Sequence, residues 1–414
     1  MIPADIPLSV YLHFPWCVSK CPYCDFNSFA NKEPQLPAER YVDSLLMDLA
    51  AQRERFAIDR PVVSVFMGGG TPSLFAPEAL ARVLEFLRAN FMLTSDAEIT
   101  MEANPGTLER GRFKAYREAG INRVSLGVQS FDDAQLKKLG RIHSADEARR
   151  AAEELHAAGL DNFNLDLMYG LPEQDVASAA QDVAAALALA PAHLSHYQLT
   201  LEAGTPFAAQ PPALPDDDAI AAMLQECQTL LASAGYGRYE VSAYARTGHR
   251  CRHNLNYWSF GDYLGAGAGA HGKLTTTAGI LRTRQTREPR RYMATATSAL
   301  MVAAVEQAQL PFEFMLNALR LLDGFSADEF RVRTGLAWGA VAGIWNRNCA
   351  AGLLETLADG RYRASEHGFD FLNDALVEFL PPACAALVSA SPRQLPMQSE
   401  GNRFGQQGLT RDLD

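Results

Sequence analysis

The chain has 414 residues, 48% of them hydrophobic and 21% charged; this composition excludes a protein dominated by disorder and allows about two globular domains. Its formal net charge of -11 argues against a protein that coats nucleic acid by neutralising phosphates. No apolar run is long enough to span a membrane and the N-terminus lacks the basic start of a signal peptide, so we expect a cytoplasmic protein.

Six strand-like segments recur along the first half of the chain and alternate with helical patterns. They begin near residues 9, 61, 97, 123, 163 and 193. Within the helical segment between the fourth and fifth strands, Ser144 is the predicted N-cap and Gly159 the predicted stop. Alternation of this kind favours an α/β fold with parallel strands, either a doubly wound sheet or a barrel.

Side chains along these strands alternate between apolar and polar residues. In the fifth strand, for example, Leu165 and Leu167 oppose Asn164 and Asp166. A parallel sheet covered on both faces is usually apolar throughout, so this alternation indicates one face against helices and one polar interior. Such an interior would hold a polar ligand.

The carboxyl ends of the first four strands carry the notable groups: the cysteines, "GGGT", Glu102 and Gln129. Ligands bind at this edge in parallel α/β folds. Taken singly, Glu102 and Gln129 are also compatible with ordinary solvated strand ends. Gly68 to Gly70 are compatible with a tight turn or with the close approach of a ligand to the backbone. Their repeated placement at one edge favours a binding site.

Cys17, Cys21 and Cys24 lie on one short segment, with three and then two residues between them. Structural zinc needs four ligands, and the fourth here would have to be His13 or a distant residue. Three thiolates on one loop can instead bind three irons of a 4Fe-4S cluster and leave the fourth iron open. We favour the cluster. The odd total of seven cysteines disfavours a disulfide framework.

The C-x3-C-x2-C spacing, with Tyr23 before the last cysteine, resembles the signature of the radical S-adenosylmethionine superfamily. The resemblance implies a partial (β/α)6 TIM-like barrel and a 4Fe-4S cluster whose open iron chelates S-adenosylmethionine. A narrower similarity is to the oxygen-independent coproporphyrinogen III oxidase group. The segments that carry it are "YLHFPWC", "MGGGTPS", "EANP", "LGVQSFD", "LGRIH" and "NLDLMYGLP".

The same resemblance implies a set of cofactor-binding residues. Those matching contacts to the cluster-bound S-adenosylmethionine are Tyr11, Gly69 and Glu102. Those matching positions that hold a second such molecule in the oxidase are Tyr23, Gly70, Thr71, Gln129, Arg141 and Asp166. The residue types suit this ligand, because carboxylates bind ribose hydroxyls and arginine binds a carboxylate.

Two features depart from the oxidase pattern. Phe26 occupies the position of the oxidase's fourth cysteine, and only 16 residues precede Cys17. Both features are similar to the oxidase-like heme chaperones, which keep the fold but bind heme and deliver it to respiratory hemoproteins. The alternatives left open are an enzyme that oxidatively decarboxylates coproporphyrinogen III and a radical enzyme with an unrelated substrate.

Residues 251 to 258, "CRHNLNYW", supply a second motif. His253, Asn254, Tyr257 and Trp258 match the H-N-x-x-Y-W pattern associated with heme binding in those chaperones, and Cys251 is an alternative iron ligand. From the residues alone, a structural segment with a hydrogen-bonded histidine and buried aromatics is favoured. The resemblance reverses this preference and implies heme as cargo, with a ligand from this segment.

The resemblance implies a barrel over residues 1 to 285 that includes the heme motif, and a small, mainly helical C-terminal domain over 292 to 385. Residues 390 to 414 lack periodicity and are predicted to be disordered. The arginines between 282 and 291 are expected on a solvated face, with heme propionates as the other interpretation. The acceptor and donor proteins, a peripheral membrane association and a dimer stay open.

Overall fold

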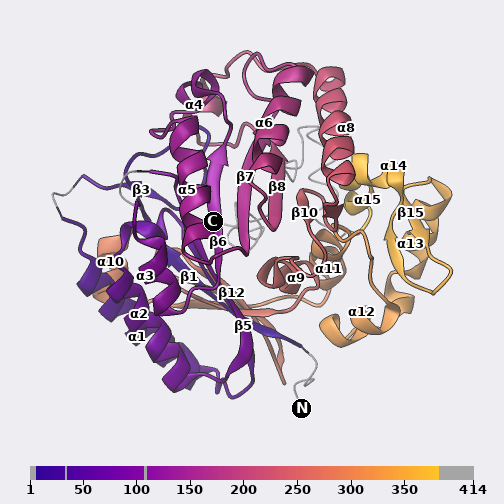
Figure 1. Ribbon diagram of the computed structural model, residues 1–414. Helices are drawn as coiled ribbons and strands as arrows, with labels where there is room; N and C mark the ends of the chain where they lie inside the picture. Colours follow the sequence, from indigo (N-terminus) through magenta and orange to yellow (C-terminus); the bar gives the residue numbers. More distant parts are fainter. Residues whose placement is uncertain (1–5, 33–34, 107–109, 382–414) are drawn as a thin grey trace.

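The computed structural model describes residues 6–32, 35–106 and 110–381 (Figure 1). Its centre is a sheet whose six neighbouring parallel strands are those expected from the sequence. Their bounds are β1 (Leu8–Phe14), β4 (Val62–Gly69), β5 (Leu93–Ala103), β6 (Arg123–Gln129), β7 (Phe163–Tyr169) and β8 (His193–Gln198). The predicted α/β fold with a partial barrel of six units is confirmed.

Helices connect these strands, and α7 and α8 follow the last of them; the helices lie around the outside of the sheet (Figure 1). Their bounds are α1 (Ala38–Arg55), α2 (Pro77–Asn90), α3 (Phe113–Ala119), α4 (Asp133–Lys138), α5 (Ala145–Ala157), α6 (Val176–Ala188), α7 (Pro206–Ala209) and α8 (Asp217–Ser233). Helix α5 begins with the expected cap: Ser144 Oγ accepts from Glu147 N, and the Glu147 carboxylate accepts from Ser144 N. It ends before Gly159, whose φ of 73° is left-handed.

The two faces of the parallel strands differ as the alternation predicted. Val10, Leu12 and Phe14 are fully buried against the helices in the main hydrophobic core. The interior face is buried too, but it carries polar side chains, among them Ser9, Ser64, Thr100, Asn164 and His193. Buried polar groups need hydrogen-bond partners or ligands, so this interior is organised by polar contacts.

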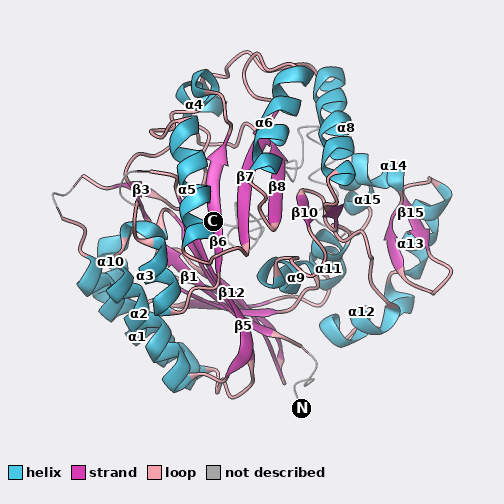
Figure 2. Cartoon of the chain, in the orientation of Figure 1, coloured by secondary structure: helices cyan, strands magenta, loops and turns pink. Residues whose placement is uncertain are grey.

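The sheet continues beyond the six parallel strands on both sides, with β14 and β9 at its edges, so it does not close into a full barrel. Strand β11 pairs in parallel with β1, and the further strands pair antiparallel (Figure 2). The added elements are β9 (Gly237–Arg238), β10 (Ala243–Ala245), α9 (Arg252–Trp258), β11 (Asp262–Ala266), β12 (His271–Thr276), β13 (Gly279–Arg284), α10 (Pro289–Thr295) and β14 (Met301–Ala304). These strands were not predicted from the sequence.

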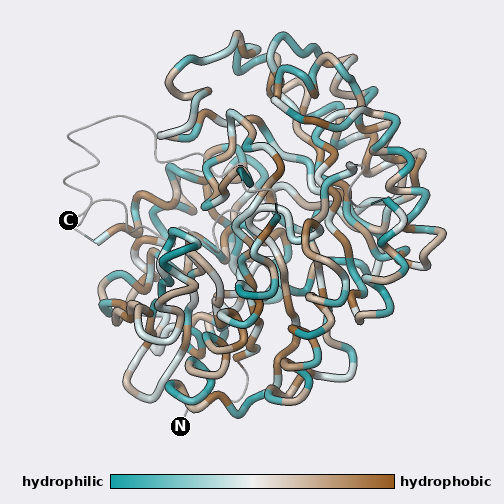
Figure 3. Tube along the Cα trace, turned by 90° about the vertical axis from the view of Figure 1, so that its left-hand side faces the viewer, coloured by the Kyte–Doolittle hydropathy of each residue, from teal (hydrophilic) through white to brown (hydrophobic). Residues whose placement is uncertain are grey.

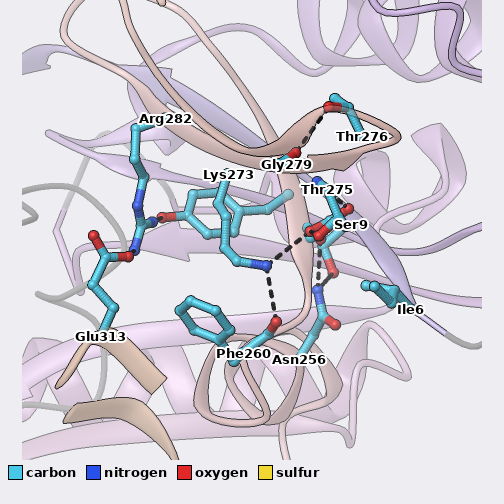
Figure 4. A network of polar contacts seen from close by, with 12 residues as sticks. Ile6, Ser9, Asn256, Phe260, Lys273, Thr275, Thr276, Gly279, Arg282 and Glu313 are labelled. Atoms are coloured by element: carbon cyan, nitrogen blue, oxygen red, sulfur yellow. Dashed lines mark hydrogen bonds and ion pairs between the residues drawn. The ribbon is translucent and has the colours of Figure 1, made fainter. Parts of the chain in front are cut away.

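Two basic residues in this extension are structural. Lys273 lies on β12, buried, where its ammonium donates to Phe260 O and Asp262 Oδ1 (Figure 4). Arg282 corrects the expectation of a solvated arginine face, because it is half-buried and donates to Tyr263 OH and Glu313 Oε2. Arg284 departs from the expectation too, since it is half-buried, whereas Arg287, Arg290 and Arg291 are exposed as expected. The partial burial of Arg282 and Arg284 follows from their place on strand β13.

Residues 310 to 377 form a mainly helical unit, drawn in orange and yellow in Figure 1, whose hydrophobic core also takes in Phe260 and Ile280 from the sheet extension. Its elements are α11 (Leu310–Ala318), α12 (Ala327–Thr334), α13 (Ala342–Ala350), β15 (Leu354–Thr356), β16 (Tyr362–Ala364), α14 (Glu366–Asp370) and α15 (Leu372–Val377). The tail predicted to be disordered, 390 to 414, lies outside the described residues.

Hydrophobic and hydrophilic stretches alternate over short distances along the chain (Figure 3). Within the described ranges, none of the helices combines the length and the apolar character that crossing a membrane requires.

Candidate functional site

A cavity opens at the carboxyl ends of the parallel strands, between the cysteine segment and the polar face of the sheet. From the cysteine segment it is lined by Cys17, Ser19, Lys20, Cys21, Tyr23, Cys24, Phe26 and Ser28. From the strands and the segments after them it is lined by Gly69, Gly70, Thr71, Glu102, Ala103, Asn104, Ser125, Gly127, Gln129, Arg141, Asp166, Ser195 and Tyr197. The site lies at the edge that the strand-end pattern predicted.

The cysteine segment is held as a loop by a short parallel pairing at its base. Strand β2 (Trp16–Cys17) pairs with β3 (Phe29–Ala30), which brings the two ends of the loop together. Inside the loop, Cys24 N donates to Cys21 O at 3.1 Å. Lys20 Nζ donates to Phe26 O and Ser28 O at 2.9 and 3.1 Å. The loop therefore presents all three thiols to one cavity.

The three cysteines are half-buried, and this burial raises the pKa of Cys17 to about 11 and raises that of Cys24. Thiols of this kind stay protonated until a metal displaces the proton. Arg141 Nη1 lies 3.6 Å from the Cys21 sulfur. The pKa of Arg141 is raised by the neighbouring Tyr23 and Cys21 despite its burial, so a permanent cation stands beside the loop.

The three thiols line one cavity and come from one loop. A structural zinc site needs four ligands, and this loop supplies three. In an iron–sulfur cluster each thiolate binds a different iron, so three thiols lining one cavity fit that group.

Close packing requires glycine in the "GGGT" segment, which also borders the cavity. Gly69 has a φ of 108°, and a Cβ there would lie 2.2 Å from the His13 ring. A Cβ on Gly70 would lie 2.6 Å from Trp16 O, while Gly70 N donates to Phe14 O at 2.7 Å. The tight turn, one of the two interpretations left open by the sequence, is therefore present, and Gly69 and Gly70 also line the cavity.

Polar side chains on neighbouring strands brace one another around the cavity. Gly69 N donates to Glu102 Oε2 at 3.0 Å, which aims this carboxylate at the glycine turn. Asn104 Nδ2 donates to Thr71 Oγ1 at 2.9 Å, and Arg141 Nη2 donates to Asn104 Oδ1 at 2.5 Å. The wall thus combines a carboxylate, an amide and a guanidinium, which together recognise hydroxyl, amine and carboxylate groups.

Gln129 carries backbone strain at the end of β6. Its φ of 70° is left-handed, which costs a non-glycine residue on the order of 1 kcal/mol or more. Its side-chain carbonyl accepts from Tyr197 OH at 2.5 Å, and both residues line the cavity. Strain held in place by a hydrogen bond at a cavity wall is typical of a binding site.

Tyr11 does not line the cavity, although the resemblance implied a cofactor contact there. It is buried one layer lower, level with Phe66 in the strand register, and its hydroxyl bonds His13 Nδ1 at 3.0 Å. The other eight cofactor residues implied by the resemblance do line it. Lining residues that the sequence did not single out include Asn104, Ser125, Ser195 and Tyr197.

The second motif lies elsewhere, on α9, and none of its residues lines the cavity. Cys251, His253, Asn254, Tyr257 and Trp258 are all buried, His253 to 1% exposure. Helix α9 packs its histidine against the interior face of the sheet. His253 Nδ1 bonds Ser64 Oγ at 3.0 Å and the ring stacks on Phe66 at 4.9 Å between centroids.

Both ends of α9 are anchored by charged groups. Glu98 on β5 accepts from Arg252 N and His253 N at 3.0 and 3.1 Å and caps the first turn. At the other end, Trp258 lies 4.3 Å under the guanidinium of Arg320, which pairs with buried Glu240. His253 Nε2 has no hydrogen-bond partner in the described part of the chain.

Two family models match the chain. The radical SAM superfamily matches residues 11–183, and the HemN C-terminal domain matches residues 305–371. The heme chaperone HemW of Escherichia coli (strain K12) is 50% identical over 375 residues, covering 90% of this chain and 98% of that protein. HemW of Haemophilus influenzae is 47% identical with the same coverage. The chain belongs to the HemW family.

More distant likenesses agree with this placement. Mouse radical S-adenosyl methionine domain-containing protein 1, mitochondrial, is 43% identical to this HemW-family chain over 303 residues, 71% of this chain and 68% of that protein. The solved structure of E. coli coproporphyrinogen III oxidase (HemN), a radical SAM enzyme, has a TM-score of 0.76 at 22% identity, covering 91% of each chain. At that identity the likeness supports the fold alone. The radical SAM family implies a 4Fe-4S cluster and S-adenosylmethionine as cofactors of this scaffold.

Proposed function

We propose that this protein is a heme chaperone that binds heme and S-adenosylmethionine on a 4Fe-4S radical SAM scaffold and delivers the heme to hemoproteins. The observation that carries the proposal is 50% identity to E. coli HemW over nearly the whole of that protein. Respiratory hemoproteins as acceptors, a cytoplasmic location, and association with a membrane surface or a second copy are further parts of this proposal.

The cluster is assigned to Cys17, Cys21 and Cys24, because these thiols share one cavity and suit separate irons. The bound cluster would supply an open iron that chelates a ligand amine and carboxylate. Glu102 and Asp166 offer carboxylates for ribose hydroxyls, and the buried cation of Arg141 offers a partner for a carboxylate. This assignment uses cavity residues only and leaves Tyr11 as a support beneath them.

Heme is assigned to the α9 segment, with His253 as the leading iron ligand and Cys251 as the alternative. His253 Nε2 is free of hydrogen bonds in the described residues, as an iron-binding nitrogen must be. Because the residue is 1% exposed, ligation requires the first turn of α9 to move away from the sheet. Tyr257 and Trp258 then offer aromatic surface for the porphyrin.

Phe26 bears on the alternative, an oxygen-independent coproporphyrinogen III oxidase. It lines the cavity at the position where the oxidase pattern has a fourth cysteine. A phenyl ring supplies neither a metal ligand nor a redox group. The similarity of fold to HemN is no evidence for the oxidase activity, because one fold can host many functions.

Anaerobic reconstitution followed by two parallel assays tests the proposal. The reconstituted protein should bind heme and pass it to an apo-hemoprotein, detected by the acceptor's absorption spectrum. With coproporphyrinogen III, S-adenosylmethionine and a competent reductant, it should form no protoporphyrinogen IX. Formation of that product without heme transfer would favour the oxidase.

A further inference from the structure

A chain of hydrogen bonds begins in the wall of the cavity and leads down the interior of the sheet. It starts at Asp166, Ser125 and Ser195, which line the cavity and all contact Asn164. Asn164 Nδ2 donates to Asp166 Oδ1 at 2.7 Å and to Ser125 Oγ at 2.8 Å, and Ser195 Oγ donates to Asn164 Oδ1 at 3.1 Å. The amide orientation of Asn164 is thereby set by the cavity wall.

The next two links have fixed donors and acceptors. Asn164 Oδ1 lies 2.6 Å from His193 Nδ1, so this nitrogen carries the proton. His193 Nε2 is then an acceptor, and it receives the hydroxyl of Tyr239 at 2.8 Å. Burial lowers the pKa of His193 well below its ordinary value, which keeps this neutral tautomer.

The chain ends on the first turn of α9. The Tyr239 oxygen accepts from Cys251 N at 3.3 Å. Cys251 Sγ lies 3.5 Å from Glu98 Oε1, which also accepts from His253 N. On the far side of α9, Asn256 donates to Ser9 Oγ, as Figure 4 shows. The turn that carries His253 is therefore connected to Asp166 through three side chains.

The buried charge of Arg123 connects the cavity wall with the first turn of α9 without using these hydrogen bonds. Arg123, 2% exposed, interacts electrostatically with both Glu98 at α9 and Asp166 in the cavity wall. Its Nε has no hydrogen-bond partner among the described residues. A change in the contacts of Asp166 therefore alters the field at Glu98 as well as the hydrogen bonds between them.

We propose that Asn164, His193 and Tyr239 are positioning residues that dock the first turn of α9 according to whether the cavity is occupied. A nucleoside hydroxyl bound by Asp166 fixes the chain and holds the turn against Glu98, which withholds His253 from heme iron. The inference rests on the proposed function and deepens it: S-adenosylmethionine and heme bind with opposing effects. Release of the ligand from the cavity frees the turn.

The effect is reciprocal because it is a coupling between two binding equilibria. S-adenosylmethionine should weaken heme binding by about fivefold or more, within the usual range of such couplings, and heme should weaken S-adenosylmethionine binding by the same factor. The two-state element is the first turn of α9, docked or released.

Hydrogen exchange tests the link without heme. In the reconstituted protein, saturating S-adenosylmethionine should slow amide exchange in a peptide covering residues 251 to 258. In Tyr239→Phe, which removes only the bridging hydroxyl, this protection should disappear while S-adenosylmethionine affinity stays within about twofold, below about 0.4 kcal/mol. His193→Gln breaks the chain one link earlier and should behave alike. Tyr236→Phe, which removes a hydroxyl bonded to Pro191 O, is the matched control and should keep the protection.

Equal protection in wild type and Tyr239→Phe, or no protection in a wild-type protein that binds S-adenosylmethionine, would overturn the inference. Heme titrations with and without S-adenosylmethionine give the second readout: the ratio of the two heme affinities should fall towards one in Tyr239→Phe and not in Tyr236→Phe. A protein that binds no heme contradicts the heme part of the proposed function, and the exchange result still decides the link. A protein that binds no S-adenosylmethionine contradicts both.

Discussion

The cavity and helix α9 both contact the polar interior face of the same sheet, but they are built in opposite ways. The cavity is formed by loops and strand ends whose side chains face open space, with three thiols on one loop. Helix α9 is closed in, with the candidate heme residues Cys251, His253, Asn254, Tyr257 and Trp258 all buried and both ends anchored by charged groups. The first region is prepared to receive a ligand as it stands, whereas the second must move before its histidine can reach one.

This difference shows that a motif specifies residue types and not their accessibility. The cysteine motif lies on a loop, and its spacing alone suggests the ligand that it binds. The H-N-x-x-Y-W motif lies on a helix of seven residues whose position is set by partners far away in sequence, such as Glu98 and Arg320. The predictions below test each region against the other.

Loss of a cluster thiol should have the largest effect. Cys24→Ala should reduce the iron and sulfide content of anaerobically reconstituted protein to background, because a three-thiolate site cannot lose a ligand and keep a cubane. Cys227→Ala is the matched control, since Cys227 is buried in α8 away from the cavity. Stoichiometric zinc without iron in the wild-type protein would contradict the cluster assignment.

The anchor at the end of α9 should dominate the stability of the closed-in region. Arg320→Met leaves Glu240 buried and uncompensated, so the free energy of unfolding should fall by about 3–5 kcal/mol in urea titrations. Arg347→Met, which breaks the exposed pair with Glu378, should cost less than about 1 kcal/mol. Equal effects of the two changes would refute the contrast between a buried and an exposed anchor.

In the cavity, Glu102→Ala should weaken S-adenosylmethionine binding about tenfold to a hundredfold, because it removes a charged hydrogen-bonding group worth about 1.5–3 kcal/mol. It also removes the acceptor of Gly69 N. Isothermal titration calorimetry on the reconstituted protein measures this change. Unaltered affinity would take Glu102 out of the binding site.

Acidification should weaken the closed-in region through its histidines. Burial lowers the pKa of His253 from 6.5 to about 3, so below pH 6.5 the unfolded chain takes up a proton that the folded protein refuses. Stability therefore falls as the pH falls from 6.5 towards 3, by about 2 kcal/mol between pH 7 and 5 for this one group. Urea unfolding of His253→Gln should show a pH dependence smaller by that amount. An identical pH dependence in both proteins would mean that His253 titrates normally in the folded state.

The smallest effect should come from Tyr11, which lies beneath the cavity. Tyr11→Phe removes the bond to His13 and should change S-adenosylmethionine affinity by less than about twofold, below about 0.4 kcal/mol. The same calorimetric titration used for Glu102 applies. A loss comparable to that of Glu102→Ala would place the Tyr11 hydroxyl among the ligand contacts after all.

The parallel strands and their helices could be predicted because their signals are local. Alternation within each strand showed which side chains face inward, and the Ser144 cap and the Gly159 stop depend on neighbouring residues only. Strands β12 and β13 form a local hairpin, with Thr276 opposite Gly279, so their signal was present in the sequence and was missed. Strand β11 could not be predicted because it is short and its partner is distant: Leu8 lies opposite Asp262. A short segment gains its strand conformation from such partners.

For the site, the sequence resemblance identified most of the residues that line the cavity. It could not show how far below the cavity a residue lies in the interior of the sheet. Glu102, Gln129 and Asp166 line the cavity because strand ends share one edge. Periodicity tells which face a residue occupies and not how far down the interior it lies, so the depth of Tyr11 below the cavity could not be predicted. The burial of His253 could not be predicted either, because it depends on contacts between residues far apart in the sequence. The bond from His253 to Ser64, for example, joins residues 189 positions apart.

Heme titration of a matched pair of variants tests most directly whether cluster and heme occupy separate sites. Heme absorption and iron–sulfide content are measured together in wild type, His253→Ala and Cys24→Ala. The expected result is that His253→Ala shifts or weakens the heme band with cluster content intact, while Cys24→Ala loses the cluster and keeps the heme band. Unaltered heme spectra and affinity in His253→Ala, Cys251→Ala and the double variant would contradict a heme site on α9.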